Sequence, residues 1–194
     1  QNLPFWAEWR STPSNDIALL EDWEEKVEKI SKQVSGQNIT SLFGVPSWML
    51  VLVKRVLKEN SVTSLEEIWP NLELFCHGGV SYKPYSDSFK KILPKNCKLL
   101  ETYNASEGFF AIQDRLDQDG LLLMLEHGIY YEFIPMSEFD GRKSKAINLE
   151  KVELGIDYSI VISTNGGLWR YILGDTVKFI SLAPFRIEIT GRTR

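Results

Sequence analysis

The chain has little cysteine and histidine and no excess of positive charge. Cys76 and Cys97 are its two cysteines among 194 residues, and they form neither a CxxC pair nor a dense framework. We therefore expect free thiols and a reducing, cytoplasmic setting. The 22 Lys and Arg residues are outnumbered by 26 Asp and Glu. Because nucleic-acid binding needs a basic surface, this balance argues against nucleic acid as the main partner.

Long apolar runs and a signal peptide are also missing. The longest apolar stretches, "WMLVLV" and "GLLLML", fall far short of the roughly 20 residues that cross a membrane. No leader pattern opens the chain. It starts at "QNLPFW" without Met and stops at "ITGRTR", so we expect both ends to be cut from a longer protein. With 43% hydrophobic and 25% charged residues, the composition favours a soluble, globular protein without a membrane partner.

Helical periodicity marks the first third of the chain. Apolar residues at helical spacing predict one long amphipathic helix over 14–34. A second helix is expected to begin at Ser47, and its apolar residues through Val53 predict burial on most of its sides. Ser64 and Glu67 have the spacing of a capping box, which predicts a short helical turn.

A strand–helix–strand pattern follows. Residues 72–77 read as a buried strand, 85–93 as a helix and 97–103 as a second strand. Such a βαβ unit is nearly always right-handed and makes its strands parallel. The loops "HGGV" and "YNASEG" would then leave the carboxyl ends of neighbouring strands. Because ligands bind at that edge of open α/β sheets, we expect a site there.

Short β runs fill the chain after residue 110, with Gly, Asp or Asn between them and no room for helices. This pattern predicts an antiparallel meander or small barrel. The fold class is therefore α/β, with a βαβ parallel-sheet part over 1–110 and a mainly antiparallel β part over 111–194.

Glycine and an aromatic ring follow the two predicted strands. Gly78 and Gly79 lack a Cβ, so a flat ligand could approach their bare backbone. Tyr103 could stack on the opposite face of a flat heterocycle. Taken singly, the glycines also fit a plain tight turn and Tyr103 an ordinary residue at a strand end. Together they predict a slot one ring thick.

Two acidic positions could serve a nucleotide. Glu107, beside the hydroxyl of Ser106, suits a magnesium–phosphate complex, because Mg²⁺ takes few carboxylates together with phosphate oxygens and water. The alternative is that Ser106 caps a helix starting at Glu107. Asp175 follows a glycine between β runs and could accept hydrogen bonds from both ribose hydroxyls. Its alternative is a turn aspartate in a hairpin.

Two arginines could offset phosphate charge through their planar donor forks. They are Arg170 and Arg192. Arg170 has an alternative, which is pairing with a carboxylate on its own sheet.

These stretches together resemble a known family. "YNASE" at 103–107 resembles the Y-x-x-S/T-E motif of adenylate-forming enzymes, and "RYILGD" at 170–175 resembles their R-Y-x-x-G-D motif. "YYEFIP" at 130–135, followed by "GLWRYILGD", narrows the resemblance to the plant auxin-responsive Gretchen Hagen acyl acid–amido synthetases and their bacterial relatives. The similarity runs from about Ile39 to Arg194.

The resemblance implies a role for each matching residue. It implies an ATP site with Gly78, Gly79, Val80 and Tyr103 around adenine, the Asn104 backbone at the adenine edge, Ser106 near phosphate, Glu107 on Mg²⁺ and Asp175 on the ribose. Glu107 and Arg192 would be the catalytic residues, with Arg192 just before an interdomain hinge at about Arg194. Asn104 replaces a small residue of many relatives, which would narrow the slot.

The resemblance also implies a place for the acyl substrate. Residues 43–53, with Val45 and Trp48, are candidate walls for it, and Phe109 is a third candidate. The alternative for most of 43–53 is a plain core helix.

The implied function is part of an ATP-dependent ligase that joins a carboxylic acid to an amino acid through acyl-AMP, with ATP and Mg²⁺ as cofactors. The phosphate loop with its lysine and the mobile C-terminal domain of such enzymes do not occur in the 194 residues. We therefore expect the chain to need these missing segments as partners and to be inactive alone. The alternatives are an acyl- or aryl-CoA ligase, a noncatalytic module for a nucleotide or small acid, and an interaction domain without a ligand.

Overall fold

The computed structural model describes residues 4–193, apart from the side chain of Arg142. The chain forms two compact units, residues 1–100 and 101–194. Each unit has its own hydrophobic core. The sequence-based division into 1–110 and 111–194 stays a prediction. Within the described residues, every helix is too short or too polar to cross a membrane.

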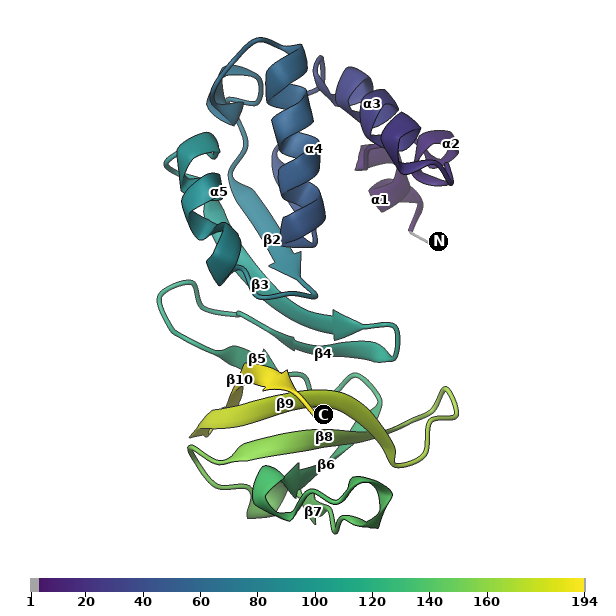
Figure 1. The fold of residues 1–194 in the computed structure, drawn as a ribbon, viewed down its shortest axis with the longest axis vertical. Coiled ribbons are helices and arrows are strands. Elements are labelled where there is room, and N and C mark those ends of the chain that lie inside the picture. The colour runs from purple at the N-terminus through teal and green to yellow at the C-terminus, as the bar shows by residue number, and fades with distance from the viewer. Residues whose placement is uncertain (1–3, 194) are drawn as a thin grey trace. The chain divides into compact units, whose positions relative to one another are not determined.

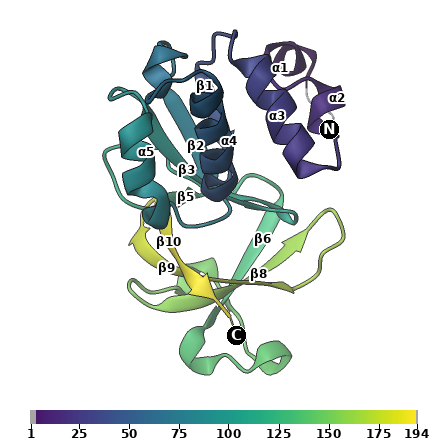
Figure 2. The ribbon, with the colours of Figure 1, turned by 45° about the horizontal axis from the view of Figure 1, so that its top comes forward.

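Unit 1 combines helices with a small parallel sheet. Its helices are α1 (Phe5–Arg10), α2 (Asn15–Ala18), α3 (Trp23–Val34), α4 (Pro46–Glu59) and α5 (Ser86–Ile92), with 3₁₀ turns at Leu65–Glu67 and Lys83–Tyr85. Its strands are β1 (Ser41–Gly44), β2 (Leu74–Gly78) and the start of β3 (Lys98–Ala105). Figures 1 and 2 show α4 and α5 beside these strands. Residues of α4, α5, β1 and β2 share one core.

The predicted βαβ unit is confirmed as β2, α5 and β3. Strands β1 and β2 are parallel, with Ser41 opposite Leu74. The first residue of β3 lies beside the start of β2, because the Lys98 N–H donates to the Glu73 carbonyl at 2.7 Å. The carboxyl ends of β1 and β2 therefore lie at one edge of unit 1, where Gly78 ends β2.

The single long helix predicted over 14–34 is wrong. The chain forms two helices there, α2 and α3, with a break at residues 19–22. The break has a local cause: the Asp22 side chain accepts a hydrogen bond from the Glu25 N–H at 2.7 Å and starts α3 as its N-cap. The capping box of Ser64 and Glu67 is confirmed.

Helix α4 buries only one side, so the predicted burial on most sides is wrong. It begins at Pro46, one residue before the predicted start. Proline suits the first helical position, because its ring already fixes φ at a helical value. Val53 and Val56 are fully buried, whereas Trp48 is 56% exposed. Because the helix covers the sheet with one stripe, Trp48 and Val51 outside that stripe stay largely exposed.

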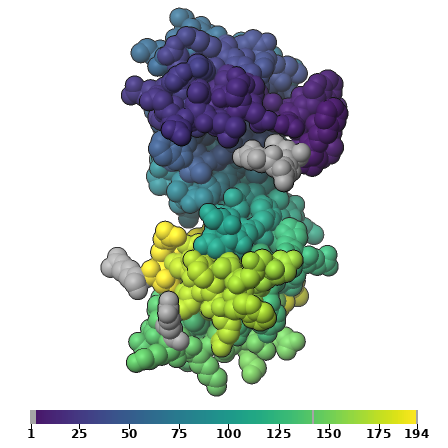
Figure 3. Space-filling model, turned by 90° about the vertical axis from the view of Figure 1, so that its right-hand side faces the viewer, coloured from purple at the N-terminus to yellow at the C-terminus, as the bar shows by residue number. Residues whose placement is uncertain are grey.

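Unit 2 is an antiparallel sheet, as predicted. After β3 it contains β4 (Gly108–Ile112), β5 (Leu121–Leu123), β6 (Ile129–Pro135), β7 (Ile147–Asn148), β8 (Asp157–Thr164), β9 (Tyr171–Leu182) and β10 (Phe185–Arg192), with 3₁₀ turns at Met136–Glu138, Gly141–Lys143 and Leu149–Lys151. The strand order is β3-β4-β5-β10-β9-β8-β6-β7. Each of these neighbouring pairs is antiparallel. Figure 3 shows the lime-coloured part of this unit, which includes β9, at the surface.

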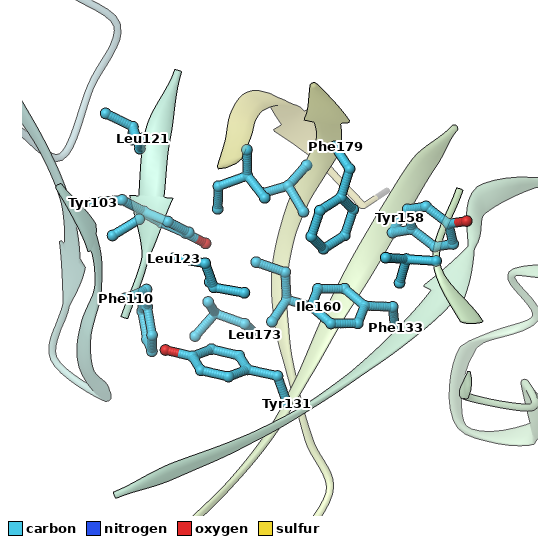
Figure 4. Packing of buried hydrophobic residues seen from close by; sticks show 14 of the residues in the cluster. Tyr103, Phe110, Leu121, Leu123, Tyr131, Phe133, Tyr158, Ile160, Leu173 and Phe179 are labelled. Carbon is cyan, nitrogen blue, oxygen red and sulfur yellow. The ribbon is translucent and has the colours of Figure 1, made fainter. Parts of the chain in front are cut away.

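The sheet of unit 2 curls around one core. Tyr103 from β3, Phe110 from β4, Tyr131 from β6 and Phe179 from β9 belong to the same buried cluster (Figure 4). Three strands, β4, β5 and β10, lie between β3 and β9 in the sheet order. The curl nevertheless lets their side chains meet across the core.

A bulge interrupts β9 at Gly174. The β8–β9 pairing jumps from Ser159 opposite Thr176 to Val161 opposite Ile172, which leaves 173–175 out of the regular ladder. Gly174 has φ +89°, a value that favours glycine because it has no Cβ. The bulge turns the strand locally and re-aims its side chains. Residue 175 therefore lies inside a strand, and the hairpin-turn alternative for it is wrong.

Candidate functional site

Asp175 is the centre of a small polar cluster in unit 2. The Tyr103 hydroxyl donates to Asp175 Oδ2 at 2.8 Å, and Arg192 Nε donates to Asp175 Oδ1 at 3.0 Å. The Asp175 side chain is 16% exposed, whereas that of Arg192 is 78% exposed. Each carboxylate oxygen thus has one donor: the buried Tyr103 hydroxyl for one and the exposed Arg192 guanidinium for the other.

Tyr103 is a core residue with one polar contact. It is 4% exposed, and its ring lies 5.0 Å from that of Phe110. Burial raises the pKa of the Tyr103 phenol, and the hydrogen bond to Asp175 raises that pKa further. Tyr103 is therefore neutral and able to donate throughout the physiological pH range. Stacking of a purine on this ring stays a prediction.

Glu107 lies in the turn between β3 and β4. Those strands end at Ala105 and start again at Gly108, so the chain forms a hairpin here. The alternative in which Ser106 caps a helix is therefore wrong. Glu107 Oε1 accepts a hydrogen bond from the Tyr171 hydroxyl at 3.2 Å.

Asn104 and Ser106 are exposed at the end of the same hairpin. Asn104 Oδ1 accepts a hydrogen bond from the Thr102 hydroxyl at 3.3 Å. The predicted contacts of Asn104 with adenine and of Ser106 with phosphate stay predictions.

The glycine candidates lie in unit 1, at the carboxyl edge of its parallel strands. Gly79 has φ +81°, and a Cβ built on it would lie 3.3 Å from Val45 Cγ2. Gly79 and Val45 are thus neighbours, while Val80 is 44% exposed. Trp48 packs edge-on against Trp23, with ring centroids 4.7 Å apart. The predicted slot pairs Gly79 of unit 1 with a residue of unit 2, and it stays a prediction.

A cavity of about 680 Å³ adjoins the turn of the β3–β4 hairpin. Glu107 and Phe109 line it, so the predicted metal residue and one predicted acyl-contact residue share a cavity. His127 and Ile129 line it as well. The His127 ring lies 5.8 Å from that of Phe109. The lining of the cavity therefore combines the carboxylate of Glu107 with apolar and aromatic side chains.

Arg170 and Arg192 have different partners. Arg170 Nε donates to Glu132 Oε2 at 3.0 Å, and the Glu132 side chain is 14% exposed. This contact favours the alternative in which Arg170 pairs with a carboxylate on its own sheet. Arg192 pairs with Asp175, and its action on a substrate stays a prediction. The predicted hinge position, Arg194, lies outside the described residues.

A metal ion would need ligands from beyond the protein. Within residues 4–193, no three His, Cys, Asp or Glu side chains gather closely enough to hold a metal. One partly exposed carboxylate is nevertheless a fitting donor for Mg²⁺, which keeps several waters and binds phosphate oxygens. Glu107 fits that role because it lies in a hairpin turn and lines the cavity.

Sequence comparison decides the family. Residues 1–98 match the model described as the GH3 family N-terminal domain, and residues 122–192 match that of the GH3 family central domain. The chain belongs to the GH3 family. The resemblance drawn from "YNASE", "YYEFIP" and "RYILGD" is thereby confirmed.

The curated GH3 relatives are plant enzymes. The chain is 31% identical to indole-3-acetic acid-amido synthetase GH3.3 of Arabidopsis thaliana over 90% of this chain and 28% of the relative. It is 29% identical to 4-substituted benzoates-glutamate ligase GH3.12 of Arabidopsis thaliana over 82% of this chain and 30% of the relative. The chain thus spans less than a third of the length of each of these GH3 enzymes.

Solved structures agree on the fold. The GH3.15 acyl acid amido synthetase superposes with a TM-score of 0.69 and 17% identity, over 91% of this chain and 41% of that one. A 2-hydroxyisobutyryl-CoA ligase superposes with a TM-score of 0.61 and 14% identity, over 86% of this chain and 35% of that one. The α/β class, with parallel strands followed by antiparallel ones, is thereby confirmed.

Sequence reasoning missed two features of this GH3 site. The first is Tyr171, which contacts the predicted metal residue through its hydroxyl. The second is that Tyr103 holds Asp175 by a hydrogen bond. The signal for Tyr171 was its place inside "RYILGD", four residues before the acid. Pairing across the curled sheet carries no such signal, because it joins positions far apart in the sequence.

Proposed function

We propose that the protein containing this chain is an ATP-dependent ligase that activates a carboxylic acid as an acyl-adenylate and transfers the acyl group to an amino acid. Membership of the GH3 family supports the class, because its curated relatives are named amido synthetases and ligases. The observation that carries the proposal is the Asp175 carboxylate held between Tyr103 and Arg192. A cytoplasmic location belongs to the same proposal.

Asp175 would bind the ribose of ATP. An ionised carboxylate has about four acceptor sites, and the two bonds to Tyr103 and Arg192 use two of them. One further site on each oxygen suits two neighbouring ribose hydroxyls. Because its side chain is 16% exposed, it is reachable while its position is held by the surrounding strands.

Glu107 would hold Mg²⁺ together with phosphate oxygens and water. When bound, Mg²⁺ would neutralise the negative charge that develops on the phosphates as pyrophosphate leaves. The hairpin turn contributes the position of the carboxylate, and Ser106 next to it contributes a hydroxyl donor for a phosphate oxygen. Arg192, which donates to the proposed ribose acid Asp175, would add a second positive charge near the nucleotide.

The cavity beside Glu107 would take the acid to be activated. Phe109 and Ile129 offer apolar surface for the body of an acyl group, and Glu107, which would hold Mg²⁺, lines the same cavity. Val45 and Trp48 in unit 1 are the other proposed acyl contacts.

The proposed reaction has two steps, adenylation of the acid and transfer of the acyl group to the amine. A carboxylate oxygen of the substrate attacks the α-phosphorus of ATP, the bond to the bridging oxygen breaks, and pyrophosphate leaves. The amine of an amino acid then attacks the activated carbonyl carbon, an amide bond forms, and AMP leaves with the bonding electrons while the amine loses a proton. The residues of this chain would act by holding the nucleotide and metal in place, so that attack becomes effectively intramolecular.

The test is ATP–pyrophosphate exchange by the complete gene product with a panel of carboxylic acids. We expect acid-dependent exchange, and we expect Asp175→Asn and Glu107→Ala to reduce it at least tenfold, the factor that about 1.4 kcal/mol of lost binding produces. Asp157→Asn is the matched control, since Asp157 pairs with Lys178 on the same sheet at 3.8 Å. Unchanged exchange in both variants would contradict the proposal and favour a noncatalytic binding module.

The second nucleophile separates amide formation from thioester formation. With amino acids as acceptors we expect release of AMP and an acyl amide product. AMP release that depends on coenzyme A instead would assign the protein to the acyl-CoA ligases.

A further inference from the structure

Two hydrogen bonds between a tyrosine and a carboxylate join the β3–β4 hairpin to β9 in opposite directions. Tyr103, on the hairpin side, donates to Asp175 on β9 at 2.8 Å. Tyr171, on β9, donates to Glu107 in the hairpin turn at 3.2 Å. Each element therefore supplies one donor and one acceptor, and the two acceptors are the proposed ribose acid and the proposed metal acid.

These contacts matter because the sheet does not join the two elements directly. Strand β3 pairs with β4, while β9 pairs with β8 and β10. Backbone ladders therefore fix the hairpin and β9 relative to each other only through intervening strands. The side-chain bonds span the curl of the sheet and act where the two acids lie.

Both acids also lie where the backbone departs from regular strand geometry. Asp175 follows the bulge at Gly174, and the β3–β4 pairing shifts register between Tyr103 and Asn104, just before the turn that holds Glu107. A bulge re-aims the side chains beside it. The hydrogen bonds from Tyr103 to Asp175 and from Tyr171 to Glu107 then fix where each re-aimed carboxylate lies.

We propose that Tyr103 and Tyr171 are positioning residues that hold the ribose acid and the metal acid at a set separation before ATP binds. The inference rests on the proposed function, and it assigns each tyrosine a separate effect. Tyr103 acts on recognition of the ribose through Asp175. Tyr171 acts on the use of Mg²⁺ through Glu107.

The two bonds differ in their surroundings. Tyr103 is 4% exposed and its neutral hydroxyl is kept from water, so its bond to Asp175 has no ready replacement. Tyr171 is 40% exposed, so water can replace its hydroxyl at Glu107. We therefore expect loss of the Tyr103 hydroxyl to have the larger effect.

The experiment compares Tyr103→Phe and Tyr171→Phe in the complete gene product. For Tyr103→Phe we expect kcat/KM for ATP to fall about tenfold, as for one lost hydrogen bond to a charged group. The kcat/KM for 2′-deoxy-ATP should fall less than that for ATP. The preference for ATP over 2′-deoxy-ATP therefore shrinks, while the Mg²⁺ dependence stays the same. For Tyr171→Phe we expect the Mg²⁺ concentration at half-maximal rate to rise about threefold, with the ribose preference unchanged.

Tyr130→Phe is the control, because Tyr130 donates to Asn148 on the same sheet at 3.3 Å and should change neither readout. Equal losses for ATP and 2′-deoxy-ATP in Tyr103→Phe, or no shift of the Mg²⁺ dependence in Tyr171→Phe, would overturn the positioning roles. A second arm uses Asp175→Asn: if Tyr103 acts through Asp175, adding Tyr103→Phe to it causes no further loss of ribose preference, whereas a full additional loss overturns the inference.

The same experiment separates the inference from the function on which it rests. If Asp175→Asn and Glu107→Ala both leave the use of ATP unchanged, the proposed function fails. If Asp175→Asn weakens ATP use while both tyrosine variants behave as wild type, only the positioning roles fail.

Discussion

Removing the charge of Asp114 should destabilise unit 2, because Asp114 is the partner of a nearly buried arginine. Arg186 donates to Asp114 through two nitrogens, at 2.5 Å and 3.0 Å. The Arg186 side chain is 8% exposed and that of Asp114 is 31% exposed. Asp114→Asn would leave the guanidinium close to the core without its counter-charge.

The size of the effect follows from this burial. Breaking a fully buried pair by changing one partner costs about 3–5 kcal/mol, and exposed pairs contribute about 0–1 kcal/mol. Since one partner here is partly in water, we expect a loss of about 2 kcal/mol in the free energy of unfolding. For a chain of this length that loss lowers Tm by about 4–8 °C.

The assay is thermal unfolding followed by circular dichroism as a function of pH. The hydrogen bond from Arg186 and its charge hold the pKa of Asp114 below its ordinary value. A carboxyl with a lowered pKa stabilises the fold above its unfolded pKa and loses this effect as pH falls through the folded pKa. The difference between wild type and Asp114→Asn should therefore be full at pH 7 and shrink at acidic pH below about 4.

Lys178→Ala is the matched control, since Lys178 and Asp157 form a longer, more exposed pair at 3.8 Å on the same sheet. We expect this control to cost less than about 0.5 kcal/mol. A loss in Asp114→Asn no larger than that of the control, or one that grows as the pH falls, would refute the reasoning.

Three further predictions concern unit 1 and the chain as a whole. Asp22→Ala should lower the free energy of unfolding by about 1 kcal/mol in urea titrations, because it removes the N-cap of α3; no change would show that the cap is dispensable. Gly79→Ala should lower the free energy of unfolding by about 1–2 kcal/mol in urea titrations, because φ +81° strains a residue that has a Cβ, and wild-type stability would contradict this. The 194-residue chain alone should lack ATP–pyrophosphate exchange, and substantial exchange would contradict the expected need for the missing phosphate loop.

Local sequence patterns predicted the elements whose cause is local. The pattern of apolar residues found β2, α5 and β3, because Phe75, Phe89 and Leu99 each face the core of unit 1. The spacing of Ser64 and Glu67 found a capping box, because both hydrogen bonds lie within four residues. The same periodicity overran the break before α3, because apolar spacing continues across Asp22 although its side chain starts a new helix.

Contacts between distant positions could not be predicted in this way. The pattern "GD" is commoner in hairpin turns, and only the pairing of β9 with β8 reveals that Asp175 follows a bulge inside a strand. The bonds of Tyr103 to Asp175 and of Tyr171 to Glu107 depend on how far the sheet curls. Sequence motifs named three of these four residues, and the geometry added Tyr171.

The central claim is that Asp175 binds the ribose of ATP, and equilibrium binding tests it most directly. The measurement compares ATP with 2′,3′-dideoxy-ATP by calorimetry, using the complete gene product and its Asp175→Ala variant. We expect wild type to bind ATP at least about tenfold more tightly than the dideoxy nucleotide, and the variant to bind both equally weakly. Equal affinity of wild type for the two nucleotides, or an undiminished preference in Asp175→Ala, would contradict it.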